Sequence, residues 1–199
     1  MSWLAPVTLR GPHASLEPLA QRHCEDLVAA VWDGELWRLW YTSIPAPDGM
    51  SAEIDARLRR QAQGEMLPFA VIDPASGRAA GMTNYLHADA ANRRLEIGAT
   101  WYAHSLQRTA INTQCKLLLL GYAFEVLSCI AVEFRTHYFN MQSRRAIERL
   151  GAKLDGILRS HSVARNGTLR DTCVYSIIAG EWPTVKAHLA SRLEAAAGV

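Results

Sequence analysis

The sequence predicts a mixed α/β (α+β) fold, in which a central sheet carries helices on both of its faces. Short runs rich in β-branched and aromatic residues alternate with amphipathic stretches along the chain. The runs at 67–72, 79–87 and 94–102 are separated only by turn sequences, which indicates antiparallel hairpins. A helical stretch then leads into a further strand, and such a β-α-β crossover implies strands that are locally parallel.

Length and composition indicate an ordinary globular protein. The 199 residues are 49% hydrophobic and 20% charged, enough to bury a full core, so we expect a single domain over residues 1–199. The net charge of +2 is too small to favour nucleic acid as the main ligand. We expect neither a signal peptide nor a membrane partner, because no apolar run approaches the roughly 20 residues of a membrane span.

The cysteines predict a reducing, cytoplasmic setting. They show no CxxC pair and no zinc-ligand spacing, so we expect free thiols and no bound metal. Each lies beside apolar neighbours, as buried thiols do, and a catalytic cysteine is the weaker alternative. The four are Cys24, Cys115, Cys129 and Cys173.

The first part of the chain predicts a short strand and two helices. Residues 7–9 form the strand, which a Gly-Pro pair closes. Residues 18–31 have apolar side chains at helical spacing, and 36–41 form a short helix or turn before a loop that contains Pro and Gly. Residues 52–63 form a polar helix whose acidic residues precede its arginines, an order that suits the helix dipole.

The stretch 93–127 contains a strand, a polar and basic loop, and an almost wholly apolar helix body at 116–127. We place the start of this helix near Asn112 or Thr113, residue types that cap helices. A loop that ends at a helix N-terminus presents free N–H groups, so it predicts an anion site, with an ordinary connection as the alternative. The remaining predicted elements are strands at 130–137, 152–160 and 169–178 and helices at 143–150 and 184–193.

Short motifs of the second half occur together at specific spacings. Asn140-Met-Gln-Ser143, followed by Ile147-Glu-Arg-Leu-Gly151, resembles a segment of the GCN5-related N-acetyltransferase (GNAT) superfamily. More narrowly, it resembles the RimJ/RimL-like branch, which modifies the N-termini of ribosomal proteins. The likeness covers about residues 7–193. Three further stretches resemble the same branch: Glu96-Ile-Gly98 before Trp101-Tyr102, Asn112-Thr113 before Lys116, and Arg170-Asp171 before Tyr175-Ser176 and Glu181-Trp182-Pro183.

The resemblance implies a mostly antiparallel sheet with a splayed strand pair, and acetyl-CoA as co-substrate. The pantetheine arm would pair with residues 101–103, and the pyrophosphate would lie on a loop written Q/R-x-x-G-x-G/A. Aligned on Asn112, this loop has Ser105 at its first position and Arg108 at its first Gly. Arg108 adds a Cβ where close approach is wanted, yet its guanidinium can pair with a phosphate. The implied coenzyme site comprises Trp101, Tyr102, Ala103, Arg108, Thr109, Ala110, Ile111, Asn112, Thr113, Asn140 and Ser143.

The resemblance also implies catalytic roles. Asn140 would bond the coenzyme arm, and Ser143 would protonate the departing thiolate. Many relatives use a Tyr seven residues after this Asn, but Ile147 stands here, so Ser143 is our candidate acid. The alternative is that Asn140 and Ser143 only cap the following helix.

Acetyl transfer also needs a neutral amine. An α-amine, with a pKa near ~8, needs less help to deprotonate than an alkyl ammonium near ~10. Glu96 is our candidate base, acting through water, because a carboxylate in a mostly apolar strand needs a reason to be there. A solvated face or an ion pair with Arg93 or Arg94 is an equal alternative. Asp171 is a second acidic candidate, and a backbone N–H near Tyr102 would polarise the carbonyl.

We therefore expect an acetyl-CoA-dependent N-acetyltransferase that acts by direct transfer in a ternary complex. Its acceptor would be a protein N-terminal α-amine, an amino acid or a small amine. Trp37, Trp40 and Tyr41 crowd one segment and form either an acceptor-facing wall or part of the core. A catalytically weak acyl-CoA-binding or sensor protein of the same fold is the alternative. A homodimer is compatible with the family, although no sequence feature indicates it.

Overall fold

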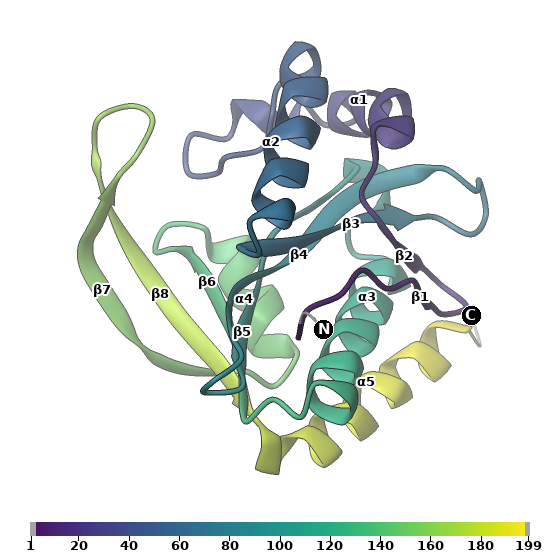
Figure 1. Cartoon of the computed structure of the whole chain (residues 1–199), viewed down its shortest axis with the longest axis vertical. Coiled ribbons are helices and arrows are strands. Elements are labelled where there is room, and N and C mark those ends of the chain that lie inside the picture. Colours follow the sequence, from purple (N-terminus) through teal and green to yellow (C-terminus); the bar gives the residue numbers. More distant parts are fainter. Residues whose placement is uncertain (1–2, 198–199) are drawn as a thin grey trace.

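In a computed structural model, which describes residues 3–197, the strands form one eight-stranded sheet of order β1-β2-β3-β4-β5-β6-β8-β7 (Figure 1). All neighbouring strands run antiparallel except β5 and β6, which run parallel. This confirms the predicted mixed, mostly antiparallel sheet. The strands are β1 (Leu9–Arg10), β2 (Ser15–Pro18), β3 (Met66–Ile72), β4 (Ala79–Asp89), β5 (Arg94–Tyr102), β6 (Ala131–His137), β7 (Lys153–Val163) and β8 (Leu169–Ile178).

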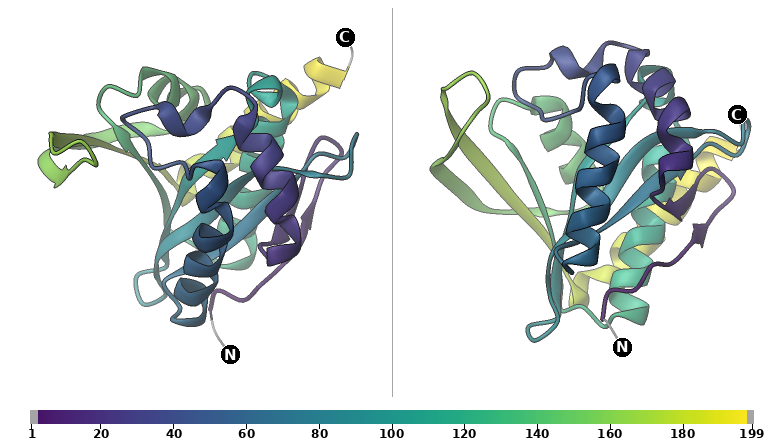
Figure 2. Two further views of the ribbon diagram at one scale, coloured as in Figure 1. Left: turned by 90° about the horizontal axis from the view of Figure 1, so that it is seen from above. Right: turned by 45° about the horizontal axis from the view of Figure 1, so that its top comes forward.

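Helices cover both faces of the sheet, as predicted (Figure 2). The buried side chains accordingly form two clusters. One lies between the sheet and the first two helices and includes Leu27, Ile54 and Met82. The larger lies between the sheet and the last three helices and includes Leu119 and Phe134. The helices are α1 (Cys24–Trp32), α2 (Met50–Ala62), α3 (Ala110–Gly121), α4 (Met141–Arg149) and α5 (Trp182–Ala197).

The N-terminal segment corrects one prediction. The helix predicted over 18–31 starts later: the chain forms a 3-10 turn at Gln21–His23 and then α1. The residues before it form a strand that was not predicted from the sequence: β2 pairs with β3, and Leu16 is fully buried there. The first strand likewise lies at Leu9–Arg10 rather than at 7–9.

The core helix also begins earlier than predicted. α3 starts at Ala110, before Asn112 and Thr113, and its N-cap is Thr109. The Thr109 Oγ1 accepts a hydrogen bond from the N–H of Ile111 at 3.3 Å. All three polar residues are chemically able to cap a helix, and the first of them has the extended backbone that an N-cap requires. The predicted helix body at 116–127 ends in a π-helical turn, Tyr122–Val126.

The segment after β6 follows the prediction closely. Asn140 caps α4, because its Oδ1 accepts a hydrogen bond from the Ser143 N–H at 3.0 Å. Gly151 ends the helix with a φ of +100°, in the left-handed region that favours glycine.

Of the cysteines, Cys24 is only half-buried, whereas the other three are buried, and all four are free thiols.

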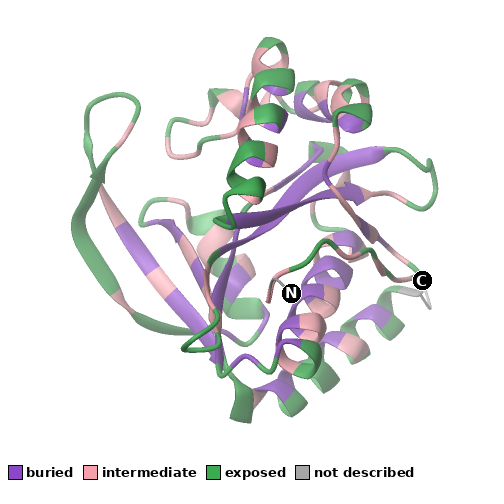
Figure 3. Cartoon of the chain, viewed as in Figure 1, coloured by how far each residue is buried: buried purple, intermediate pink, exposed green. Residues whose placement is uncertain are grey.

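Burial separates the centre of the sheet from its edge (Figure 3). β3 and most of β4 are buried, whereas β7 is the edge strand and is exposed along nearly its whole length. The β7–β8 hairpin therefore projects from the body of the molecule and holds its tip beyond the end of β6 (Figure 1). Within residues 3–197, no helix is long and apolar enough to cross a membrane.

Candidate active site

The two parallel strands at the middle of the sheet separate after a short contact. β5 and β6 pair only through Arg94 with Ala131, Leu95 with Val132, and Glu96 with Glu133. Beyond Glu96, β5 stays paired with β4 but has no strand on its other side among the described residues. The main-chain groups on that side of residues 97–102 are thus open to an extended ligand, in the manner of an added strand. This is the splayed pair that the sequence resemblance implied, and it contains Trp101 and Tyr102.

The first turn of α3 faces the end of this open strand. The Tyr102 hydroxyl donates to Asn112 Oδ1 at 3.1 Å and ties β5 to the helix start. The N–H groups from Ala110 to Asn112 have no helical acceptor, because the first intrahelical bond is donated by Thr113, and of these three only the Ile111 N–H is bound by the Thr109 side chain. The site predicted at this loop therefore has the geometry of an anion-binding helix N-terminus.

The early start of α3 changes the alignment of the phosphate loop. An alignment that starts at Gln107 instead of Ser105 matches Q/R-x-x-G-x-G/A at its first position, but it places Ala110 at the first Gly and Asn112 at the last position. Arg108 then occupies a variable position rather than the first glycine. It still has a φ of +65°, and its exposed guanidinium has no partner in the part of the chain that the structure describes.

The start of α4 lies across the split from that loop. The Gln142 Nε2 donates to Gln107 Oε1 at 2.8 Å and links the two helix starts. Because Asn140 caps α4 through its Oδ1 alone, its amide NH2 is left without a partner among residues 3–197. The half-buried Ser143 offers only its backbone N–H to the cap, so its hydroxyl is also free within those residues. The capping interpretation is thus confirmed for Asn140 and wrong for the Ser143 hydroxyl.

Glu96 is buried at the point where the strands separate. Its Oε2 lies 2.9 Å from His87 Nδ1 and 3.4 Å from Arg135 Nε. Burial raises the pKa of the Glu96 carboxyl, although His87 and Arg135 act in the opposite direction. Arg94 does not neutralise it, because Arg94 pairs with Glu133 at 2.7 Å. A buried carboxyl with a raised pKa at a strand split is suited to proton transfer.

Gly98 makes room for the Glu96 side chain. A Cβ at residue 98 would collide with the Glu96 carboxylate and would lie 3.0 Å from Leu86 Cδ1. We therefore expect Gly98→Ala to displace the carboxylate and to lower kcat by about fivefold, since small displacements of catalytic groups are costly. Steady-state kinetics with acetyl-CoA would measure this. Gly156→Ala on β7 is the matched control, because nothing lies within 4 Å of its added Cβ. Equal kcat values for the two variants would contradict the prediction.

Lys116 places a positive charge behind the open strand. It follows Asn112 by one helical turn and is buried, with its Nζ 3.1 Å from Thr100 Oγ1. It has no ion pair with any described carboxylate, and burial lowers its pKa to about 8. Its charge adds to the positive end of α3 and favours an anionic ligand on this side of the sheet.

The aromatic residues of the segment before α2 lie in two different environments. Trp40 and Tyr41 line a cavity of about 150 Å³ beyond the end of β6, and Trp40 meets His137 edge to face at 5.1 Å. Trp37 is not part of this cavity. It packs against Trp32 at 4.9 Å and against the core cluster beneath α1 and α2.

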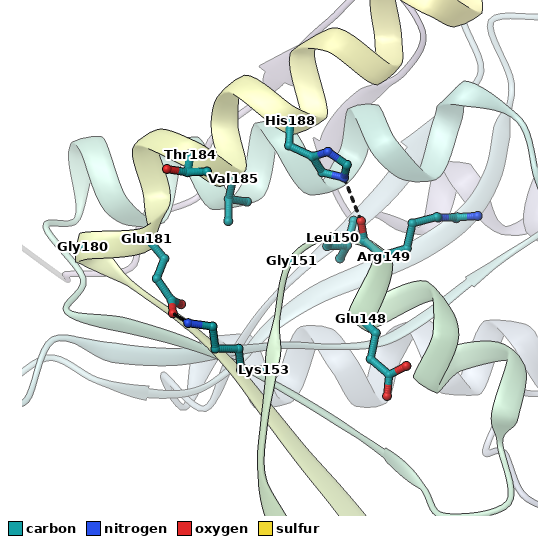
Figure 4. A pocket seen from close by; sticks show the side chains of 10 residues that line it. All are labelled: Glu148, Arg149, Leu150, Gly151, Lys153, Gly180, Glu181, Thr184, Val185 and His188. Carbon is teal, nitrogen blue, oxygen red and sulfur yellow. Dashed lines mark hydrogen bonds and ion pairs between the residues drawn. The ribbon is translucent and has the colours of Figure 1, made fainter.

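A larger cavity, of about 680 Å³, lies elsewhere, between the end of α4 and the start of α5 (Figure 4). Its walls include the Lys153–Glu181 ion pair and His188, which contacts the carbonyl of Arg149 at 3.0 Å. It contains none of the predicted site residues. We assign the chemistry to the strand split, because the split combines an open strand, two helix starts and a buried carboxyl. Residues 3–197 hold no cluster of three His, Cys, Asp or Glu that suits a metal ion.

Several residues near Glu96 were not identified from the sequence. Arg170 and His137 line the small cavity with Trp40, although they come from different strands. From the sequence, Arg170 was noted only within the Arg170-Asp171 motif and His137 only as the end of a strand, since it is the sheet order that brings the end of β6 to the start of β8. Asp171, the second acidic candidate, instead pairs with Arg159 at 2.6 Å and accepts from the Ser160 N–H at 2.7 Å.

Comparisons with known proteins agree with this geometry. Residues 14–153 match the family model described as acetyltransferase (GNAT) domain. A GCN5-related N-acetyltransferase from Brucella melitensis is 33% identical, with a TM-score of 0.83 over 96% of this chain and 86% of that one. A structure from T. thermophilus, described as an acetyltransferase, is also 33% identical, with a TM-score of 0.81 over 96% and 99%. Mycobacterium smegmatis RimJ has a similar fold at 21% identity, with a TM-score of 0.77 over 94% and 93%. No curated protein sequence matches the chain.

Proposed function

Because this chain belongs to the GCN5-related N-acetyltransferase (GNAT) family, we propose that it transfers an acetyl group from acetyl-CoA to a primary amine by direct transfer in a ternary complex. The observation that carries the proposal is the position of Glu96. It is the last residue of β5 that pairs with β6, and its buried carboxyl has a raised pKa. The candidate base therefore lies where the open part of β5 begins. The reactive end of a ligand paired with that strand would lie beside it.

The residues around the split fit acetyl-CoA. Of residues 101–103, Tyr102 directs its main-chain groups to the open side, toward the amides of the pantetheine arm, whereas the Ala103 N–H donates to the Ala80 carbonyl at 2.8 Å. The first turn of α3 offers N–H groups to the pyrophosphate, and Arg108 has no other partner among the described residues. The amide NH2 of Asn140, at the start of α4, is available as a further donor. The RimJ structure, which has a similar fold, contains CoA-disulfide, which supports a coenzyme A site on this fold.

A residue is then available for each step of the transfer: deprotonation of the amine, polarisation of the carbonyl and protonation of the leaving sulfur. Glu96 accepts the proton of the amine through a water molecule, which suits its raised pKa. A backbone N–H near Tyr102 polarises the acetyl carbonyl. The unpaired hydroxyl of Ser143 supplies the proton that the leaving sulfur needs. The acceptor approaches from the side of Trp40 and Tyr41, and an α-amine needs the least help from the base.

One observation favours the alternative, a weak acyl-CoA-binding or sensor protein. The position where many relatives have a catalytic tyrosine is Ile147, and this residue is buried in the core. No side chain at that position can act as an acid. Turnover separates the two functions, because a sensor binds acetyl-CoA without releasing thiol when amines are added.

The coenzyme site is tested first by thermal unfolding. We expect acetyl-CoA and free CoA to raise the Tm by several degrees, since a ligand at ~100 times its Kd adds about 2.7 kcal/mol to the free energy of unfolding. ATP should shift the Tm little, because it lacks the pantetheine arm that pairs with β5. No shift with either CoA species would overturn the proposed function.

A further inference from the structure

We propose that the acceptor carries a carboxylate in addition to its amine, and that Arg170, His137 and Arg165 bind this carboxylate in the small cavity beside the strand split. This inference rests on the proposed function and names the class of acceptor. Amino acids and peptides with a nearby carboxylate belong to this class, whereas polyamines and other purely cationic amines do not.

The cavity is formed by three segments that are distant in sequence. Trp40 and Tyr41 come from the segment after the 3-10 turn Leu36–Arg38, His137 ends β6, and Arg165 stands at the tip of the β7–β8 hairpin. Arg170 enters from β8. With a volume of about 150 Å³, the cavity holds one small group rather than a whole ligand. Its polar and aromatic walls suit the end of an acceptor whose remainder extends toward the split.

His137, a wall of this cavity, has an unused donor that is covered by protein, so a ligand oxygen reaches it only if the ring or its cover shifts. Its side chain is buried, and its Nδ1 accepts a hydrogen bond from the Phe139 N–H at 3.1 Å. In the neutral ring the proton must therefore be on Nε2. Burial, together with the charge of Arg170, lowers the pKa of His137, although Asp171 acts in the opposite direction. The buried Nε2 has no partner among residues 3–197, and such a donor is costly unless a ligand oxygen accepts from it.

The two arginines are also available. Arg170 is half-buried and donates from Nε to Thr172 Oγ1 at 3.1 Å, but no described carboxylate forms an ion pair with it. Arg165 is exposed and has no partner in the described residues. Asp171, the neighbouring acid, is already bound to Arg159. The charged groups that line the cavity are therefore all cationic, and a planar carboxylate matches the donors of a guanidinium.

The charges also fix the direction of the acceptor. Arg135 contacts Glu96, and His137, which lines the cavity, follows Arg135 two residues later on the same face of β6, so the cavity and the candidate base are neighbours. An amine directed toward Glu96 and a carboxylate directed toward Arg170 satisfy both groups. The reverse orientation, or a second ammonium in the cavity, would place like charges together.

The test compares acceptors that differ only in the carboxylate. Thiol release would be measured with L-phenylalanine, L-leucine and glycyl-L-phenylalanine, each beside its C-terminal amide. Rates are expressed per concentration of neutral amine, because amidation lowers the amine pKa. We expect kcat/KM to be about tenfold higher for the acid in at least one pair, as for a charge-assisted hydrogen bond. Equal values in every pair would overturn the inference.

Variants of the cavity residues show which side chains cause the preference for the acid. Arg170→Gln should lower kcat/KM for the acid more than for the amide, so that the preference for the acid is lost, whereas Arg170→Lys should keep part of the preference. His137→Phe preserves an aromatic ring beside Trp40 but removes the donor, so it should reduce the preference. Arg192→Gln, an exposed arginine of α5, is the matched control. A preference that survives Arg170→Gln would also overturn the inference.

A binding measurement keeps the test independent of turnover. In the presence of CoA, N-acetyl-L-phenylalanine should raise the Tm of the wild-type protein, and N-acetyl-L-phenylalaninamide should not. Arg170→Gln should lose the shift. The same result with acid and amide overturns the carboxylate site, even when acetyl-CoA itself binds. Failure of the proposed function is recognised separately, as the absence of any shift with acetyl-CoA or CoA.

Discussion

Replacing Glu96 with glutamine is expected to lower kcat at neutral pH by about a hundredfold, the lower end of general base catalysis. The wild-type rate should rise with pH as Glu96 loses its proton, over a range above the ordinary glutamate pKa of 4.5, because burial raises the pKa of this carboxyl. Glu96→Gln removes this rising limb, while the Kd for acetyl-CoA stays unchanged. A pH–rate profile of both proteins measures the effect.

Glu133→Gln is the matched control, because Glu133 is paired with Glu96 across the split but binds Arg94 and Arg135. The negative charge of Glu133 helps to raise the pKa of Glu96, so this variant should keep the rising limb and move it to lower pH. A Glu96→Gln profile identical to that of the wild-type protein would exclude Glu96 as the base.

The raised pKa of Glu96 also has a consequence for stability. The native state holds the Glu96 proton more tightly than the unfolded chain, so this stabilisation is present below pH 4.5 and is lost as the pH rises through the native pKa. Glutamine resembles the protonated form and has no such loss. The Tm of Glu96→Gln relative to wild type should therefore increase as the pH rises above 4.5.

Replacing Ser143 with alanine is expected to lower kcat by about thirtyfold, with no change in acetyl-CoA binding. A leaving thiolate, with a pKa near ~8.5, needs less help than an alkoxide, so the effect is smaller than that of a strong general acid. Because the Ser143 hydroxyl takes no part in the helix cap, the Tm should stay the same. Single-turnover kinetics and a thermal melt would measure the two quantities.

Asn140→Ala provides the contrast, because it removes the cap itself and should lower the free energy of unfolding by about 1 kcal/mol. If Ser143→Ala destabilised the protein to the same degree and weakened coenzyme binding and kcat equally, the role of Ser143 would be structural.

Local signals were sufficient for much of the fold. The turns, the alternation within strands and the cap at Asn140 all depend on residues a few positions apart, and each was predicted correctly. The start of α3 was not. Several neighbouring polar residues can cap a helix. Thr109 is the N-cap because the backbone that leads from β5 into α3 is extended at that residue. The helix over 18–31 formed over most of its predicted length, but the strand β2 before it was missed, because β2 gains its pairing from β3, which lies far along the chain.

The sequence by itself predicted most of the main elements in their order from composition and spacing, and its motifs resembled the family that the comparisons show and supplied candidate groups for the chemistry. Only the tertiary structure decided the environment of Glu96. From the sequence, the neighbouring Arg94 was a possible ion-pair partner of Glu96. In the sheet, Arg94 instead pairs with Glu133, and Glu96 lies beside His87 and Arg135. The tertiary structure likewise joined Trp40, His137 and Arg170 around one cavity. Desolvation and charge act through space, so no local pattern could specify them.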